Sequence, residues 1–403
     1  MFDWFTINNY ELACLCVLAG LLIYQGWYYL RYLAAPIRML RCQEHTANAV
    51  SETESVSQGV AADGQLDLFE SSVKGVSVIV CARNEQDNLE EYLHVLLEQD
   101  YPLYEVIVVN DGSEDDTQIV VERYQQHYRH LRYTFVPKQA RVRSTKKLAL
   151  TLGVKASHFD YLLLTDADCR PQSSHWISAM MDGFQDEQTE MVLGYGAYFM
   201  NTTCINRLIQ YDTLFNGLQF MGQALQHHPY MGVGRNLLYK KDLFMRNNGF
   251  AGLLNNLSGD DDLFVNKVAT RTNTAVVCTP DSLTWSVPKG SWREWLQQKR
   301  RHLSVAPKYK YATKLRLGIE PMTRGLWYAG LIVVGCTCGA GAWLIAGGMF
   351  VIRYVMQMIV LSNASRRLGG RCWGPSVLWY DMILPLLSAE ILLTTRPQQN
   401  QRW

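Results

Sequence analysis

Short apolar runs alternate with segments of helical spacing from residue 76 to residue 278. The runs are rich in Val, Ile, Leu and Tyr, which is typical of buried strands. They predict strands at 76–80, 105–110, 133–136, 162–165, 191–195 and 275–278. Between them, apolar residues spaced at about the helical period predict helices at 89–97, after 115, at 146–154, at 206–227 and at 263–268.

The alternation of strands and helices predicts an α/β domain. Strand–helix–strand units form right-handed crossovers, which favour a Rossmann-like, mostly parallel sheet with helices on both faces. In such a sheet, ligands bind at the carboxyl ends of the strands.

Two much longer apolar stretches flank this region. Residues 10–32 carry charges only near their ends, and residues 326–352 carry none. Both stretches are long enough to cross a bilayer as helices. The sequence predicts one span before the domain and two or three after it, at 326–347, 350–361 and 377–393.

Charges around these stretches predict their orientation. Arg31 and Arg38 follow the first stretch, and basic residues on that side place the next domain in the cytoplasm. We therefore expect a multi-pass protein of the inner (cytoplasmic) membrane. Arg353 and Glu390 are expected to pair, because an unpaired charge in lipid is costly.

Two polar segments complete the predicted layout. Residues 42–72 are rich in Ser, Glu and Gln, which is typical of a flexible linker. Residues 292–317 alternate basic and apolar positions, which is typical of a helix on the membrane surface. The predicted parts are an anchor (1–41), a linker (42–74), a cytoplasmic domain (75–290), an interfacial segment (291–320), membrane helices (321–395) and a tail (396–403).

Composition adds little to this picture. The 403 residues include 38 Lys and Arg and 37 Asp and Glu, so a net charge of +1 gives no reason to expect a nucleic-acid partner. Ten cysteines show no C-x-x-C spacing, which predicts neither a zinc site nor disulfides.

Acidic residues follow several of the predicted strands. Asp166 and Asp168 come directly after the strand at 162–165, and Glu85 and Asp111 follow two earlier strands. Two carboxylates so close repel each other, so the pair suits a divalent cation and a polyphosphate. A solvated loop is the alternative for this pair taken alone.

Two further motifs come later in the chain. Gly232 and Gly234 would let the backbone approach a ligand, although a tight turn explains them equally well. The acids 260–262 open a helix, where they exceed what capping requires.

Together these motifs resemble family 2 glycosyltransferases of the GT-A fold, in the membrane-associated branch of ceramide glucosyltransferases and polysaccharide synthases. The resemblance covers residues 76–302. It rests on VSVIVCARNE, VVNDGSEDDT, LLLTDADC, SGDDDL and QKRRH, in this order.

The resemblance implies roles for individual residues. Ala82, Arg83 and Glu85 would lie around the base and ribose, and Asp111 would hydrogen-bond the base. Asp166 would contact the nucleotide, and Lys146 would lie near the phosphates. Asp168 would bind Mg²⁺ or Mn²⁺. The catalytic base would be Asp260 or Asp261, depending on how the family motif is aligned. Gly234, Asn236, Gln298, Arg301 and His302 would lie around the acceptor and the diphosphate. Residues 75–200 would be the nucleotide-sugar half and 201–290 the acceptor half.

We therefore expect an inverting transfer of sugar from a nucleotide-sugar, a UDP-sugar by resemblance, to a membrane lipid or lipid-linked acceptor. A processive polysaccharide synthase is the alternative, although His302 replaces a family tryptophan that helps form the acceptor platform. An inactive nucleotide-binding membrane scaffold is a remote third possibility. The sugar, the acceptor and the oligomeric state stay open.

Overall fold

The computed structural model describes residues 7–44, 73–137, 144–254 and 258–394. Most of the predicted linker and the predicted tail lie outside them. The chain forms two compact units. Of the described residues, 36–44, 73–137, 144–199, 227–254 and 258–287 belong to a sheet unit, and 7–35, 200–226 and 288–394 belong to a helical unit.

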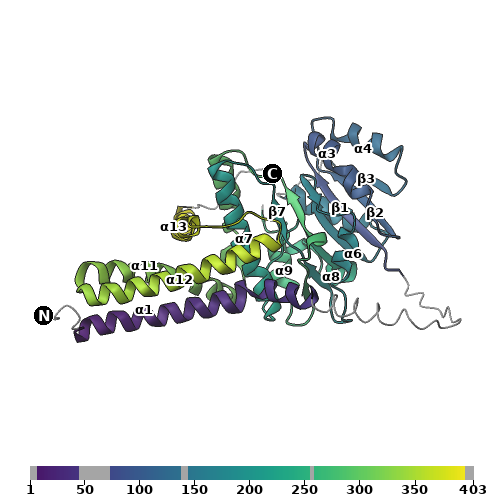
Figure 1. The fold of residues 1–403 in the computed structure, drawn as a ribbon. Helices are drawn as coiled ribbons and strands as arrows, with labels where there is room; N and C mark the ends of the chain where they lie inside the picture. Colours follow the sequence, from purple (N-terminus) through teal and green to yellow (C-terminus); the bar gives the residue numbers. More distant parts are fainter. Residues whose placement is uncertain (1–6, 45–72, 138–143, 255–257, 395–403) are drawn as a thin grey trace, which may run out of the picture. The chain divides into compact units, whose positions relative to one another are not determined.

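The main sheet has seven strands in the order β3-β2-β1-β4-β8-β6-β9. Figure 1 shows its neighbouring strands β1, β2 and β3. Strands β1, β2, β3 and β4 pair in parallel, and β8 pairs antiparallel with β4 and β6. The mostly parallel sheet is therefore confirmed. The strands are β1 (Val76–Ala82), β2 (Tyr104–Asn110), β3 (Leu131–Phe135), β4 (Tyr161–Asp166), β6 (Met191–Leu193), β8 (Leu237–Lys240) and β9 (Thr274–Val276).

The central strands have the continuous apolar character of strands covered on both faces. All seven residues of β1 are buried, as expected when helices pack on both sides of a parallel sheet. The helices of the sheet unit are α3 (Gln86–Leu97), α4 (Thr117–Gln125), α5 (Thr145–Ala156), α6 (Trp176–Met181), α8 (Lys241–Arg246) and α9 (Asp262–Val268).

A second, three-stranded sheet lies beside the end of β4. It contains β5 (Cys169–Pro171), β7 (Gly196–Tyr198) and β10 (Thr284–Ser286), in the order β5-β10-β7. Strand β5 begins directly after Asp168, so this sheet fixes the chain as it leaves the predicted cation site.

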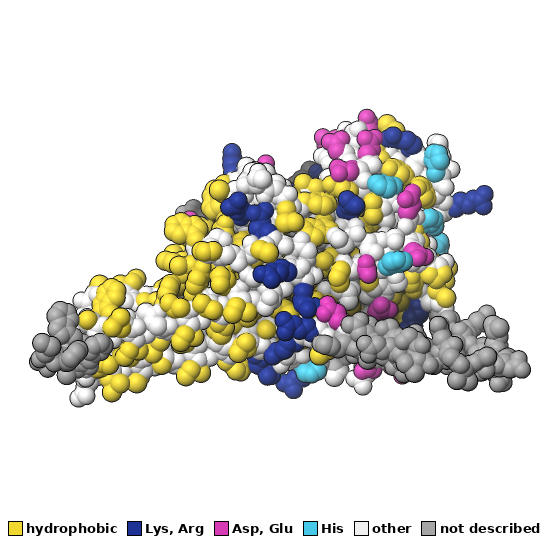
Figure 2. Space-filling model, viewed as in Figure 1, with side chains coloured by type: hydrophobic (Ala, Val, Ile, Leu, Met, Phe, Trp, Pro, Cys, Tyr) yellow, Lys and Arg dark blue, Asp and Glu magenta, His cyan; other side chains and the backbone are white. Residues whose placement is uncertain are grey.

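The helical unit contains long helices with apolar surfaces. Its elements are α1 (Asn9–Tyr28), η2 (Tyr29–Leu33), α7 (Cys204–Leu225), α10 (Trp292–Leu303), η5 (Ala306–Lys308), α11 (Tyr311–Thr337), α12 (Ala340–Arg367) and α13 (Ser376–Thr394). Among the described residues, three segments are long and apolar enough to cross a membrane, namely Asn9–Leu33, Ala340–Arg367 and Ser376–Thr394. Figure 2 shows apolar side chains gathered over α1, α11 and α12, as expected of surfaces that face lipid.

The predicted boundaries of two spans are wrong. Helices α11 and α12 are separated at Cys338 and Gly339, which lie inside the predicted span 326–347. Helix α12 continues without a break from the end of that predicted span into the next one, which was predicted to begin at residue 350. The Gly339 N–H donates to the Glu11 carboxylate at the start of α12. Because residues 326–352 are uniformly uncharged, hydropathy alone had no marker for this break.

Helix α7 also departs from the predicted layout, since it packs with the helical unit rather than within a domain of residues 75–290. Its contacts with η2 explain this. A side chain at Gly222 would collide with the backbone carbonyl of Tyr32, so the glycine lets the two helices approach closely.

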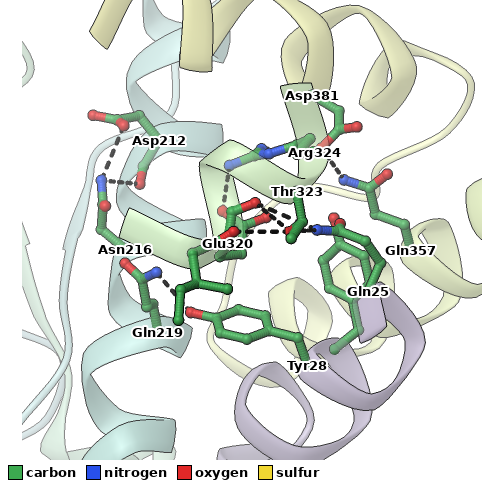
Figure 3. Close-up of polar contacts among 12 residues, drawn as sticks. Gln25, Tyr28, Asp212, Asn216, Gln219, Glu320, Thr323, Arg324, Gln357 and Asp381 are labelled. Atoms are coloured by element: carbon green, nitrogen blue, oxygen red, sulfur yellow. Dashed lines mark hydrogen bonds and ion pairs between the residues drawn. The ribbon is translucent and has the colours of Figure 1, made fainter. Parts of the chain in front are cut away.

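A cluster of buried charges joins helices α11, α12 and α13 (Figure 3). Asp381 accepts from Arg324 at 3.0 Å and from Arg353 at 2.9 Å, and Glu320 pairs with Arg324 at 2.7 Å. The predicted pair of Arg353 with Glu390 is therefore wrong. Glu390 is exposed, while Asp381 is fully buried beside Arg353.

Candidate functional site

The predicted nucleotide-binding residues lie where β1, β2 and β4 end. In the parallel register, Ala82 lies opposite Asn110, and Cys81 lies opposite Asp166. The Asp111 N–H donates to the Ala82 carbonyl at 2.8 Å. Residues distant in sequence thus meet at one sheet edge, where ligands bind in open α/β sheets.

Asp111 is a buried carboxylate at this edge. One of its oxygens, Oδ2, is buried and has no hydrogen-bond partner among the described residues. Burial raises the pKa of Asp111, and the nearby Arg83 partly offsets this. A buried acceptor without a donor is costly, so the carboxylate is suited to a ligand N–H.

Arg83 and Glu85 lie beyond β1, at the start of α3. Glu85 is half-buried and accepts from the Asn88 side chain, while its backbone N–H donates to Thr117 Oγ1 at 3.0 Å. The Ala82 side chain is buried in the core of the sheet unit.

Lys146 connects two of the predicted acidic motifs. Its ammonium lies 2.8 Å from Asp166 Oδ1 and 3.7 Å from Asp260 Oδ2. Lys146 is on the first turn of α5, whereas Asp166 ends β4 and Asp260 precedes α9. One cation therefore holds together the D-x-D motif and the acidic triplet, and its charge is already balanced by these carboxylates.

Asp261 is held differently from Asp260. Its Oδ2 accepts from the Gly234 N–H at 2.6 Å, and its Oδ1 accepts from the Asp262 N–H at 2.9 Å. Burial raises the pKa of Asp261, and the adjacent Asp260 carboxylate raises it further. Asp261 is thus an oriented carboxylate with an increased proton affinity.

Asp166, Asp168 and Cys169 bring potential metal ligands within 4.8 Å of one another. The two carboxylates are the hard oxygen donors that Mg²⁺ and Mn²⁺ prefer. Burial raises the pKa of the Cys169 thiol, and the Asp168 carboxylate adds to this. The thiol donates to Asp168 Oδ1 at 3.3 Å. Because Mg²⁺ and Mn²⁺ prefer oxygen ligands, the donor set fits a divalent cation held by the two carboxylates.

Asn236 is not available for a direct contact with a ligand. Its side chain is fully buried, donates to the carbonyls of Tyr195 and Ser282 and accepts from the Trp176 indole. The predicted acceptor or diphosphate contact of this amide is therefore withdrawn, and Asn236 instead positions the turn before β8. Gly234, also predicted here, binds Asp261 through its backbone N–H.

Gln298, Arg301 and His302 lie on α10 in the helical unit, so their predicted place around the acceptor stays a prediction. The same helix carries Lys299, which forms an ion pair with Asp212 of α7 at 2.5 Å. Sequence analysis gave Lys299 no such role, because its partner lies far away in the chain.

Comparisons with known proteins agree with this geometry. Residues 77–247 match the family model "Glycosyl transferase family 2". Residues 77–247 are therefore a family 2 glycosyltransferase domain. This confirms the family resemblance inferred from the strand-end motifs.

Curated relatives of this domain include glycosyltransferases of bacteria. The chain is 30% identical over 96 residues to a poly-β-1,6-N-acetyl-D-glucosamine synthase of Staphylococcus epidermidis, covering 24% of this chain and 22% of the relative. It is 24% identical over 232 residues to the probable glycosyltransferase YdaM of Bacillus subtilis, covering 56% of this chain and 54% of the relative. The chain thus spans well under two thirds of the length of these relatives.

A solved structure shows the same fold across nearly the whole chain. The mannosyltransferase PcManGT from Pyrobaculum calidifontis, in complex with GDP-Man and Mn²⁺, matches with a TM-score of 0.59 at 18% identity. The match covers 95% of this chain and 100% of the other. The family 2 glycosyltransferase domain therefore has the GT-A fold. The three described segments that could cross a membrane lie outside residues 77–247.

Proposed function

We propose that the protein transfers a sugar from a nucleotide-sugar to a lipid or lipid-linked acceptor at the cytoplasmic face of a membrane. The observation that carries this proposal is the junction of Asp166, Lys146 and Asp260, which joins the D-x-D motif to the acidic triplet at the ends of the strands. The family 2 domain supports the reaction class, and the apolar helices support a membrane-bound acceptor.

The donor would bind at the ends of β1, β2 and β4. Asp111 would accept a hydrogen bond from the base, with Arg83 and Glu85 beside it. Asp168, together with Asp166, would hold Mg²⁺ or Mn²⁺, which supplies positive charge for the leaving diphosphate. The structural neighbour with GDP-Man leaves both uracil and guanine open for this chain.

Asp261 is the better candidate for the catalytic base. A general base works best when its pKa lies close to the working pH. Burial raises the pKa of Asp261 from the low value of an ordinary aspartate toward that pH. Asp260 is instead engaged in an ion pair with Lys146. One base opposite one leaving group describes a single displacement, so we propose inversion at the anomeric carbon.

Labelled nucleotide-sugars test the proposal. Membranes that contain the protein are incubated with UDP- and GDP-sugars, and the lipid phase is extracted. We expect label in the lipid phase with one of the donors and none with the Asp168→Asn protein. Transfer to soluble sugars alone, with no lipid product, would contradict the lipid acceptor.

A processive polysaccharide synthase is the second candidate, favoured by the similarity to the poly-β-1,6-N-acetyl-D-glucosamine synthase. The two functions differ in their products. A single transfer yields one lipid of fixed mass, whereas processive synthesis yields a ladder of long chains on a gel.

A further inference from the structure

Arg235 lies in the turn between Gly234 and β8, next to the predicted site, and sequence analysis gave it no role. Its backbone carbonyl accepts from Thr165 Oγ1 at 3.1 Å and from Thr284 Oγ1 at 3.2 Å. Thr165 directly precedes Asp166. The position of Arg235 is therefore tied to the strand that presents the D-x-D motif.

The Arg235 side chain is held by neutral groups. Its guanidinium carbon lies 4.3 Å from the centre of the Tyr198 ring, and Nη2 donates to the Gly196 carbonyl at 2.7 Å. A side chain at Gly196 would collide with the guanidinium. Gly196 and Tyr198 thus form a slot that fixes a planar cation by stacking and one hydrogen bond.

The charge of Arg235 has no carboxylate partner in the described part of the chain. No Asp or Glu oxygen described there lies within 4.0 Å of its guanidinium, and its Nε is buried without a hydrogen-bond partner. Arg235 is half-buried, and a cation partly withdrawn from water and in direct contact with neutral groups is costly. Lys146 differs, because two carboxylates already balance its charge.

The surroundings of Arg235 keep it charged and close to the predicted cation site. Burial opposes its charge, but Tyr198 and Asp168 are among the groups that raise the pKa of Arg235 above its usual value. Gly234, the preceding residue, binds Asp261. Arg235 is therefore influenced by the predicted metal ligand Asp168 and directly follows the residue that binds the proposed base, so a bound anion there would complete its environment.

We propose that Arg235 binds a phosphate group of a substrate through the terminal nitrogens of its guanidinium, since its Nε is buried against Gly196. This inference rests on the proposed function and adds a phosphate ligand to that site. A planar guanidinium binds phosphate oxygens in a two-point geometry that a lysine cannot reproduce. The phosphate belongs either to the donor diphosphate or to a phosphate-bearing lipid acceptor.

The test compares Arg235→Gln and Arg235→Lys in the full-length protein, with Arg246→Gln as the control. Arg246 is an exposed arginine of the sheet unit whose charge is paired with Glu190 and Asp242. The dissociation constants of UDP, GDP and the two nucleosides are measured by calorimetry. The KM for a polyprenyl phosphate and for an uncharged lipid acceptor is measured by transfer of label.

If the donor supplies the phosphate, Arg235→Gln weakens nucleoside diphosphate binding about tenfold or more and leaves nucleoside binding unchanged. If the acceptor supplies it, nucleoside diphosphate binding stays normal and the KM rises only for the polyprenyl phosphate. In either case Arg235→Lys gives a smaller loss, and Arg246→Gln behaves as the unmodified protein.

The inference is overturned if folded Arg235→Gln protein shows normal constants for both ligands. Should Arg235→Gln not fold, Arg235→Lys decides, since unchanged binding and KM in that variant exclude a specific guanidinium contact. Failure of the proposed function is seen separately, because the unmodified protein would then neither bind nucleoside diphosphates nor transfer sugar.

Discussion

Asp260 and Asp261 are neighbours in sequence but have different surroundings, which predicts different effects of their removal. We expect Asp261→Asn to lower the turnover rate by about 10² to 10⁴ because it removes the proposed base. Asp260→Asn should retain more activity, because it removes a partner of Lys146 and leaves the proposed base in place. Rates of labelled sugar transfer at saturating donor check this order, and a larger loss in Asp260→Asn would assign the base to Asp260 instead.

The same pair predicts a change in pH dependence. If Asp261 is the proposed base, activity requires its deprotonated form and should fall as the pH drops through the raised pKa of this group. The negative charge of Asp260 contributes to that rise. Asp260→Asn should therefore lower the pKa of Asp261 and move the acidic limb of the rate profile to lower pH. An acidic limb that stays in place or moves to higher pH would contradict the proposed coupling.

Asp168 predicts a dependence on the cation. Asp168→Asn replaces a charged ligand by a neutral one, so we expect a loss of about 10² or more in transfer and a need for higher Mn²⁺ concentration. Titration of Mn²⁺ at fixed donor measures both effects. Asp242→Asn is the matched control, since Asp242 is exposed on α8 and pairs with the exposed Arg246.

At the scale of helices and strands, the closest packing between α7 and η2 depends on one glycine. Gly222→Ala should separate these helices, because the new methyl group would collide with the immobile carbonyl of Tyr32. We expect a loss of roughly 1 to 3 kcal/mol in stability, as for other overpacked sites. Thermal stability in detergent, followed by size-exclusion chromatography, measures it. Gly347→Ala on α12 is the control, because open space surrounds that position, and equal stability of the two variants would refute the close contact.

How far the sequence predicted the fold depended on whether a local pattern carried the information. The buried run before Asp166 and the helix period after Glu85 are local, so the strand ends and their convergence could be predicted. The break at Gly339 could not, because the residues around it are uniformly apolar. The Asn236 amide donates to the carbonyl of Tyr195, and Arg235 stacks on the ring of Tyr198. Both tyrosines reach the turn only through tertiary packing, so the sequence did not indicate these contacts.

At the scale of the whole molecule, the helical unit depends on a buried ionic cluster in a region that is otherwise apolar. Asp381 accepts hydrogen bonds from four side chains, which are Arg324, Tyr328, Arg353 and Gln357. It therefore links α13 to both α11 and α12. Removing its charge takes a carboxylate partner from both Arg324 and Arg353. Arg324 keeps its ion pair with Glu320, whereas Arg353 loses the ion pair that it forms with Asp381.

Asp381→Leu should consequently destabilise the helical unit by about 3 to 5 kcal/mol, the usual cost of breaking a buried ion pair on one side. Replacing Arg353 by Met in the same protein removes the stranded cation and leaves Arg324 paired with Glu320, so the double variant should be more stable than Asp381→Leu alone. Yields of monodisperse protein and melting temperatures in detergent complete this double-mutant cycle. Glu390→Gln, also on α13, is the control and should change neither the yield nor the melting temperature, because Glu390 is exposed. If the stability losses of Asp381→Leu and Arg353→Met are additive, Asp381 and Arg353 are not coupled. Helix α13 is then held by its apolar contacts instead.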